Sequence, residues 1–398
     1  MKQPVQSAGR FDAQFEGRPV WAEVSLGAIA HNLRLIRRTV GRKRKILAIV
    51  KANAYGLGAV DISKALARMG VEAFGVTCSQ EGVELREAGI RQPILLLTGF
   101  WPGEEKRILQ SNLTPTVARL GQVALLERAA AKRNGKRSRK KLAFHLKIDS
   151  GMNRLGISPR DIPAFIRELA KCPHLELGGT FTHFASSEDF RTAQNERQEK
   201  IFAESLQQLR AVGVSPGIVH MANSGAICRR PATWADMVRP GAALYGYHQG
   251  FEPAEVAADV RKELPLKPCL SLRSRIISLR EICPGESVGY SGRFIAERPS
   301  RIAVIAAGYA DGIVRQRTNR GCVILRGRLV PLVGTISMDL SMLDVTDITD
   351  AAIGDVVTIY GRDGDASLEV DQVARQIGTV TSDLLCAMGR RIPRFYLS

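Results

Sequence analysis

Short apolar segments alternate with amphipathic segments along the first two thirds of the chain. In segments such as "IAHNLRLIRRTV" and "DIPAFIRELAKC", apolar residues recur at helical spacing. The apolar segments lie at residues 45–51, 73–78, 93–99, 113–118, 142–149, 177–183, 217–222 and 241–246. Eight strands alternating with helices over about 230 residues predict a (β/α)8 barrel. The start of the eighth strand is the least defined boundary, because the strand can begin a few residues earlier.

The pattern changes after about residue 265, where β-rich segments such as "LSLRSRIISLREI" and "RIAVIAAGY" follow one another with Gly and Pro turns and little helix. We therefore expect a polar N-terminal extension at 1–18, a barrel at 19–262 and a mainly β domain at 263–398. The early segment 20–26, "VWAEVSL", also alternates and is a candidate for joining the β domain.

Composition narrows the protein class. A chain of 398 residues with 45% hydrophobic and 24% charged residues is typical of a globular protein of two domains. No apolar segment reaches the length of a membrane span, and residues 1–18 lack the apolar core of a signal peptide. We expect a cytoplasmic protein without a membrane partner.

The formal charge of +18 is concentrated in two basic runs, 42–45 and 132–141. No aromatic residues interleave with them, so we interpret both as solvated connections and expect no specific nucleic-acid partner. The seven cysteines are scattered singly, without metal-site spacing. We expect reduced thiols in or near the core and no metal.

Polar residues fall repeatedly at the ends of the predicted barrel strands, where barrel enzymes build their active sites. They are Lys51, Lys147, Asp149, Arg154, His183, Asn223, Ser224 and Arg239. A lysine in an apolar, cationic setting can form a Schiff base, and Ser224 with the backbone N–H groups after "RPG" can hold a phosphate. These residue types indicate pyridoxal phosphate, a cofactor that attaches to lysine and stabilises a carbanion.

The chain resembles the alanine racemases in a set of motifs that occur in the family's order. These are "VKANAYG", "KIDSGMNRLG", "THFASSED", "HMANSGA", "VRPGAALYG", "VGYSGRF", "GYADG" and "MDLSMLDVT". The resemblance runs from about residue 19 to the C-terminus. It implies a (β/α)8 barrel with a β domain, pyridoxal phosphate, alanine as substrate and a homodimer with shared active sites.

The resemblance also implies two bases and their supports. Lys51 is similar to the family's cofactor lysine, and Tyr290 resembles the second base, which the partner subunit supplies. Arg239 resembles the arginine that faces the pyridine nitrogen, and His183 the histidine that links this arginine to the tyrosine.

Other residues match positions around the cofactor and the substrate. Arg154 resembles the arginine near the substrate carboxylate, and Lys147 a lysine that carries a carbamate in many members. Met338 and Asp339 resemble partner-subunit residues at the substrate entrance. The candidate cofactor contacts, mainly to the phosphate, are Tyr55, Asn223, Ser224, Gly241 and Ala242.

The chain departs from the family at several of these places. The family often has His at Leu57, usually Arg and Cys at Thr335 and Ser337, and Gln at Leu340. Members commonly have a tyrosine at Ser382, whose hydroxyl reaches the phosphate. A serine is too short for the same contact, so this departure affects phosphate affinity and pocket size.

Four other functions compete with an alanine racemase that supplies D-alanine for peptidoglycan. A racemase of broader specificity, acting on serine or a basic amino acid, fits a pocket widened at Ser382. An amino-acid decarboxylase usually places an acid at the pyridine nitrogen, where this chain has Arg239. A single-barrel cofactor carrier has no β domain, and a nucleic-acid-binding protein has only the positive charge in its favour.

Overall fold

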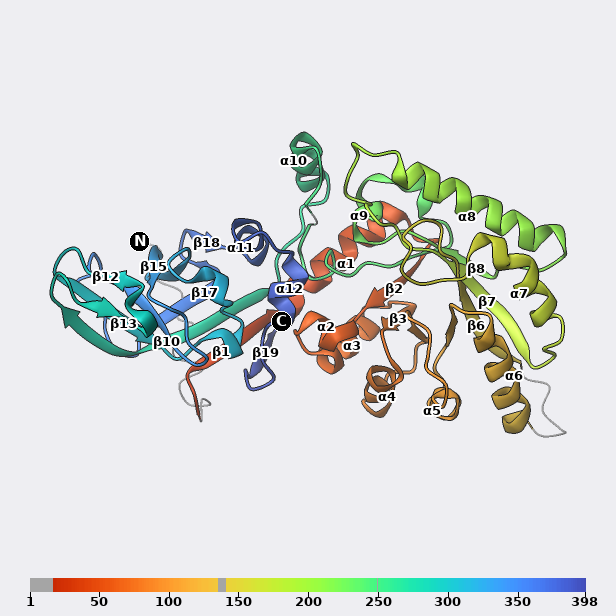
Figure 1. Cartoon of the computed structure of the whole chain (residues 1–398), viewed down its shortest axis with the longest axis horizontal. Helices are drawn as coiled ribbons and strands as arrows, with labels where there is room; N and C mark the ends of the chain where they lie inside the picture. The colour runs from red at the N-terminus through yellow and green to blue at the C-terminus, as the bar shows by residue number, and fades with distance from the viewer. Residues whose placement is uncertain (1–16, 135–140, 249) are drawn as a thin grey trace. The chain divides into compact units, whose positions relative to one another are not determined.

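The computed structural model describes residues 17–134, 141–248 and 250–398 (Figure 1). Most of the polar N-terminal extension and part of the basic run at 132–141 lie outside the described residues. The chain divides into two compact units. The barrel unit contains Ala28–Lys267, and the β unit combines the residues up to Gly27 with Pro268–Ser398.

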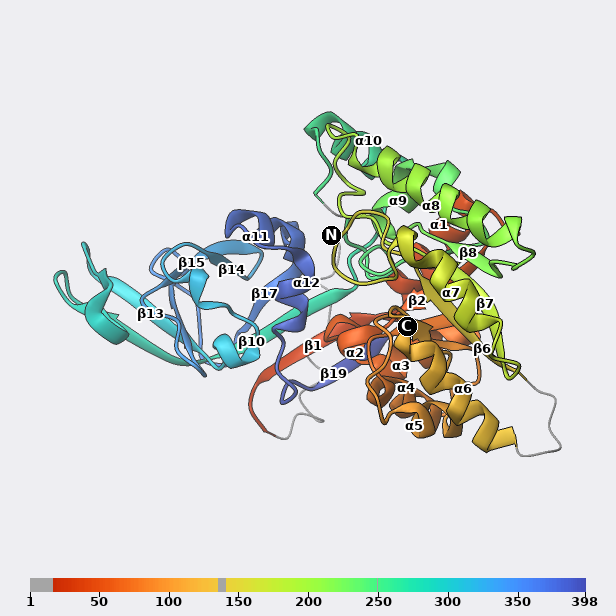
Figure 2. The ribbon, with the colours of Figure 1, turned by 45° about the vertical axis from the view of Figure 1, so that its right-hand side comes forward.

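In the part of the barrel unit that the structure describes, eight short parallel strands have helices outside them (Figures 1 and 2). The strands are β2 (Lys45–Ile49), β3 (Ala73–Val76), β4 (Ile94–Leu96), β5 (Thr116–Val117), β6 (Leu142–Lys147), β7 (Leu175–Phe181), β8 (Ile218–His220) and β9 (Met237–Val238). The helices are α1 (Leu26–Val40), α3 (Ala59–Arg68), α4 (Ser79–Glu87), α5 (Glu105–Gln110), α6 (Gly121–Asn134), α7 (Ile162–Leu169), α8 (Gln194–Ala211), α9 (Ser224–Arg229) and α10 (Ala254–Glu263). Strands such as β3 and β4 are buried along their whole length, which explains why they are continuous apolar runs in the sequence.

Hydrogen bonds close these strands into a ring. The strands pair in the orders β4-β3-β2-β9 and β5-β6-β7-β8. The N–H of Leu96 donates to the carbonyl of Thr114 over 3.0 Å, which joins the two sheets on one side. On the other side the N–H of Arg239 donates to the carbonyl of Ala222 over 2.9 Å. The result is the (β/α)8 barrel that the alternating pattern predicts.

The predicted eighth strand was wrong in position. The strand is β9, Met237–Val238, and residues 241–246 form turns instead. The Pro240 carbonyl still accepts the N–H of Ile49 over 3.0 Å, but Pro240 has no N–H of its own to continue the ladder. The apolar segment 241–246 is nevertheless almost entirely buried, so its hydrophobic pattern reflects burial in turns rather than a strand.

Within the described residues, the main sheet of the β unit contains a closed six-stranded ring. The strands of the whole sheet are β1 (Val20–Ser25), β10 (Leu270–Ile282), β13 (Ser300–Ile305), β14 (Cys322–Leu325), β15 (Arg328–Val333), β16 (Ser341–Asp344), β17 (Val356–Asp363), β18 (Ala366–Leu368) and β19 (Arg394–Leu397). The ring runs β17-β14-β15-β16-β13-β10 and closes because β10 also pairs with β17. The long strand β10 pairs with β17 before a bulge near Ile276 and with β13 after it. β1 pairs with β10 and with β19.

Smaller elements complete the β unit. A hairpin joins β11 (Ser287–Val288) to β12 (Phe294–Ile295), and two short helices, α11 (Val370–Gln376) and α12 (Thr381–Cys386), lie near the C-terminus. Cys283 and Cys386 are exposed, so the expectation of thiols in or near the core is wrong for these two. Among the described residues, no helix is both long and apolar enough to cross a membrane.

Candidate active site

Lys51 begins a left-handed turn at the end of the first barrel strand. β2 ends at Ile49 rather than at Lys51, and α2 (Lys51–Tyr55) follows. Four successive residues, 52–55, have φ between 51° and 57°. None is glycine, and the left-handed conformation costs about 1–2 kcal/mol for each such residue. The turn leaves the Lys51 side chain exposed at the C-terminal end of the barrel.

Two side chains hold this turn in place. The Asn53 carboxamide oxygen accepts the N–H of Ala59 over 2.8 Å. Glu81 accepts the N–H of Ala52 over 2.6 Å and the N–H of Thr77 over 2.7 Å. Strain of this kind persists only where the surroundings impose it, typically at functional sites. Sequence reasoning missed Glu81, because nothing in "SQEGVELRE" distinguishes it from a solvent-facing helical acid.

Arg239 is the buried centre of a polar network beneath the barrel mouth. One of its terminal nitrogens donates to the carbonyls of Thr182 over 2.7 Å and Met221 over 2.9 Å. The same nitrogen lies 3.1 Å from His183 Nδ1, and the other lies 3.1 Å from His220 Nδ1. Burial lowers the pKa of Arg239 to about 9, so the guanidinium remains charged at neutral pH.

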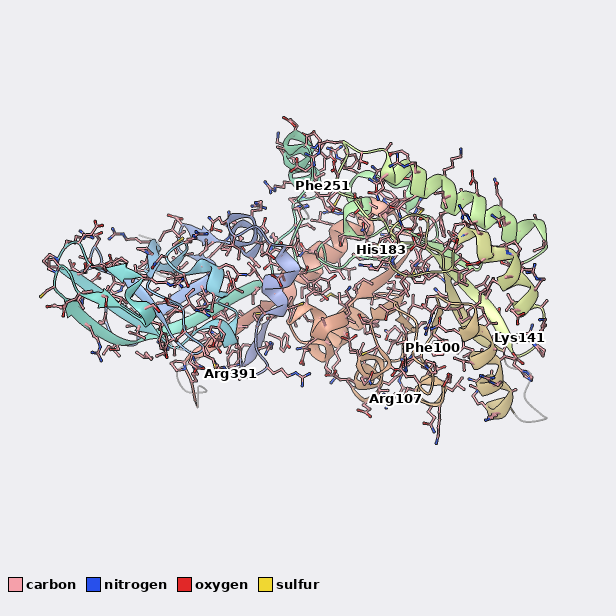
Figure 3. The ribbon with its side chains drawn as sticks, viewed as in Figure 1. Phe100, Arg107, Lys141, His183, Phe251 and Arg391 are labelled. Carbon is pink, nitrogen blue, oxygen red and sulfur yellow. The ribbon has the colours of Figure 1, made fainter. Side chains whose placement is uncertain are left out.

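The contacts of this network determine which ring nitrogen of His183 and of His220 carries the proton. Burial, reinforced by Arg239, lowers the pKa of His145 to about 4 and the pKa values of His183 and His220 well below the usual range. An arginine only donates, so a protonated Nδ1 facing it would oppose two N–H groups, and Nδ1 of His183 and of His220 is therefore the unprotonated nitrogen. The proton of each neutral ring then lies on Nε2. His220 donates it to His145 Nδ1 over 2.9 Å, and Arg239 does not use the Nε2–H of His183, a residue labelled in Figure 3.

Lys147 ends β6 and is the most strongly perturbed lysine of the site. Burial, together with the neighbouring charges of Arg239 and Arg154, lowers its pKa from 10.5 to about 7. Asp149 accepts the backbone N–H groups of Gly151, Asn153 and Arg154 at 2.9–3.0 Å, which holds the loop that carries the exposed Arg154.

Backbone and hydroxyl groups gather where β8 and β9 end. The Ser224 hydroxyl oxygen accepts the N–H of Gly241 over 2.9 Å and the N–H of Ala243 over 3.3 Å, and Ala242 lies between these two residues. A Cβ added to Gly241 would lie 2.4 Å from the Tyr55 hydroxyl, so a larger residue here would displace the end of the Tyr55 side chain. Asn223 caps α9 by accepting the N–H of Ala226 over 3.0 Å.

The remaining predicted site residues lie in the β unit. The side chains of Tyr290 and Met338 are 71% and 53% exposed. Arg391, labelled in Figure 3, donates to Asp339 over 2.7 Å and to the buried Asp311 over 2.8 and 3.0 Å. These hydrogen bonds hold the pKa of Asp339 below its usual range. Ser382 is half-buried in α12.

The barrel site suits an anionic cofactor. Lys51, Lys147, Arg154 and Arg239 contribute cationic groups, and the charges of the other three depress the pKa of Lys147. The carboxylate of Asp149 is occupied by backbone N–H groups. Such an excess of positive charge is reduced when a phosphate binds.

Comparison with protein families identifies both units. A family model described as "Alanine racemase, N-terminal domain" matches residues 24–249, and one described as "Alanine racemase, C-terminal domain" matches residues 269–396. The chain belongs to the alanine racemase family. It is 39% identical over 387 residues to an alanine racemase of Geobacter sulfurreducens, and the match covers 96% of this chain and 98% of the relative.

Solved alanine racemases share the fold over almost the whole chain. The Bacillus anthracis enzyme with bound L-Ala-P aligns with a TM-score of 0.88 at 31% identity, covering 96% of each chain. The Bartonella henselae enzyme with covalently bound pyridoxal phosphate aligns with a TM-score of 0.84 at 30% identity, covering 96% of this chain and all of the other.

Sequence reasoning overlooked two residues of the arginine network. His145 and His220 lie within strands that were interpreted only as apolar runs. One signal was available for His145: it is two residues from Lys147 on the same strand, so both side chains face the same side. For His220 the sequence contains no comparable signal, because a lone histidine in an apolar strand is usually a packing residue.

Proposed function

We propose that this protein interconverts L- and D-alanine with pyridoxal phosphate as cofactor. The observation that carries the proposal is the buried Arg239, held by backbone carbonyls and two neutral histidines at the mouth of a barrel that also presents Lys51. An arginine beneath the cofactor is the feature by which the sequence differs from decarboxylases of the same architecture.

Residues of the barrel unit would hold the cofactor. Lys51 would bind its carbonyl group, and Tyr55, Ser224, Gly241 and Ala242 would surround the phosphate, with Asn223 fixing α9 beside them. When bound, pyridoxal phosphate supplies an electron-withdrawing ring that stabilises negative charge at the substrate Cα. Arg239, as a donor that stays protonated, would leave the ring nitrogen without a proton. A weaker electron withdrawal disfavours protonation at the wrong carbon, and therefore transamination.

Lys51 and Tyr290 are the proposed acid and base groups. Inversion requires one group to remove the α-proton and another to deliver a proton on the opposite face. Lys51 acts on one face and Tyr290 on the other. His183, whose Nε2–H is not used by Arg239, resembles the family histidine that links the arginine to the tyrosine, and it would stabilise the phenolate of Tyr290 by donating to it.

Arg154 is proposed to bind the substrate carboxylate, and Met338 and Asp339 to line the substrate entrance. Lys147 has a pKa of about 7, so much of its amine is neutral at physiological pH. A neutral amine attacks carbon dioxide and loses a proton to give a carbamate. That anion would offset the charges of Arg154 and Arg239 and orient Arg154.

We further propose, from the family, a cytoplasmic homodimer with shared active sites whose product supplies peptidoglycan synthesis. The barrel unit would hold the cofactor, and the β unit would supply Tyr290, Met338 and Asp339 to the partner.

A racemisation assay with purified holoenzyme tests the activity. Each L-amino acid is incubated separately, and the D-enantiomer is quantified by chiral chromatography. Alanine should be racemised much faster than serine, lysine or arginine. A preference for another amino acid would replace alanine as the substrate, and no racemisation of any of them by cofactor-loaded protein would refute the proposed reaction class.

A further inference from the structure

Thr335 connects two segments of the β unit through a buried hydroxyl. It lies in the loop between β15 and β16, and its side chain is 4% exposed. Its hydroxyl donates to the backbone carbonyl of Tyr290 over 2.9 Å. The Tyr290 side chain is exposed within the β unit, so packing against this unit does little to hold it. The position of the phenol therefore depends on the backbone of residue 290.

The backbone around Tyr290 follows an uncommon path. Gly289 has φ of 73° and Ser291 has φ of 62°, so a left-handed residue flanks Tyr290 on each side. The left-handed conformation is unfavourable for a serine, so it persists only where neighbouring residues impose it.

The segment that contains Tyr290 and the loop that contains Thr335 approach each other closely, so their backbones have little room to move. A Cβ on Gly334 would lie 2.6 Å from the carbonyl oxygen of Val288, and a Cβ on Gly289 would lie 3.5 Å from the backbone nitrogen of Thr335. Asn319 also joins the segments, since it accepts the N–H of Gly334 over 2.7 Å and donates to the carbonyl of Arg293 over 2.8 Å.

We infer that Thr335 is a positioning residue for Tyr290, setting the reach of the phenol through its backbone carbonyl. The inference rests on the proposed role of Tyr290 as a base. A threonine suits the task because its branched Cβ restricts χ1 and keeps the hydroxyl directed at one acceptor. The hydroxyl acts on the main chain, so it supports the base without placing a charge beside it.

The experiment compares Thr335→Val, which keeps the shape and removes the hydroxyl, with Thr335→Ser, which keeps the hydroxyl. The equilibrium constant between enantiomers is unity, so any variant must change kcat/KM equally in the two directions. The informative readout is α-proton exchange in deuterium oxide, measured separately from L- and D-alanine in recovered substrate. Exchange from one enantiomer requires Lys51, and exchange from the other requires Tyr290.

Thr335→Val should lower kcat/KM roughly tenfold, which corresponds to about one hydrogen bond of positioning. Exchange should slow selectively from the enantiomer that also exchanges slowly in Tyr290→Phe. Thr335→Ser should restore the wild-type ratio of the two exchange rates. Thr180→Val is the matched control, because Thr180 is buried in β7 and its hydroxyl donates to the carbonyl of Pro216 over 2.8 Å. It should leave that ratio unchanged.

Each outcome separates the inference from the proposed function. If Tyr290→Phe shifts the exchange ratio and Thr335→Val does not, Thr335 has no positioning role and the two-base proposal stands. Failure of Thr335→Ser to restore the ratio would also overturn the inference. If Tyr290→Phe leaves the ratio unchanged, Tyr290 is not a base, and both the two-base proposal and the positioning role of Thr335 are refuted. Should Thr335→Val not fold, Thr335→Ala removes the same hydroxyl and gives the same readout.

Discussion

Replacing Lys147 with methionine should stabilise the protein most at neutral pH and progressively less as the pH rises. Methionine keeps most of the length of the lysine side chain and removes its charge. Lys147 is 7% exposed, and its pKa is lowered from 10.5 to about 7, first by burial and then by Arg239 and Arg154. Asp149 acts in the opposite direction, and the charge of Lys51 is a smaller contribution.

The sign follows from proton binding. Because the pKa of Lys147 is lower in the folded protein than in the unfolded chain, the unfolded chain binds more protons between about pH 7 and pH 10.5. The wild-type protein therefore gains stability as the pH rises through this window, by about 1.4 kcal/mol per pH unit from this group. The whole effect is on the order of 5 kcal/mol. Below about pH 7 both states are protonated, so the penalty is complete and constant.

The assay is chemical denaturation of wild type and Lys147→Met at a series of pH values from about 7 to about 10. Buffers are depleted of carbon dioxide, so that the amine stays free. The difference in unfolding free energy between the two proteins should shrink steadily across this range. Lys64→Met, at an exposed position on α3, is the control and should show no such trend. A difference for Lys147→Met that stays constant with pH would refute the lowered pKa, and with it the basis for a reactive neutral amine.

Three further predictions concern the proposed catalytic residues and the binding of the cofactor phosphate. Lys51→Ala should lose both the visible absorbance of bound cofactor and racemisation; a rate near wild type would refute its assignment. Mixing Lys51→Ala with Tyr290→Ala protein should restore part of the activity, because a mixed dimer rebuilds one intact site, and no recovery under demonstrated subunit exchange would argue against sharing. Ser382→Tyr should slow cofactor loss during dialysis, since a charge-assisted bond to the phosphate contributes roughly 1.5–3 kcal/mol, and it should lower the serine-to-alanine activity ratio. No change in either quantity would mean that another group already occupies the tyrosine's place.

The strand-and-helix order of the barrel was predictable because it depends on local periodicity. Buried parallel strands are apolar on both faces, so segments such as 45–49 and 73–76 stand out between amphipathic helices. The failure at 241–246 has the same origin. Burial makes a segment apolar whether it forms a strand or turns, and only the pairing of Met237 and Val238 with β2 determines which residues join the sheet.

The residue types of the site and their positions in the chain were predictable from the sequence, but the exposure and the pKa of each side chain were not. The sequence placed Lys51, Lys147 and Arg239 near strand ends, and by itself it suggested Lys51 as the lysine with the unusual environment. In the structure Lys51 is exposed, and Lys147 is the lysine whose pKa falls to about 7. Burial and the distances to other charges set a pKa, and both depend on segments far apart in the chain.

By itself, then, the sequence determined the barrel, the β domain, the family and the choice of residues proposed to react, since these follow from local patterns and from motifs. The tertiary structure alone decided how those groups are held. The left-handed turn at 52–55 is imposed by Glu81, the tautomers of His183 and His220 by Arg239, and the backbone of Tyr290 is tied to Thr335. Each of these contacts joins residues separated by 19 to 56 positions in the chain, and no local pattern encodes such a contact because it forms only when the chain folds.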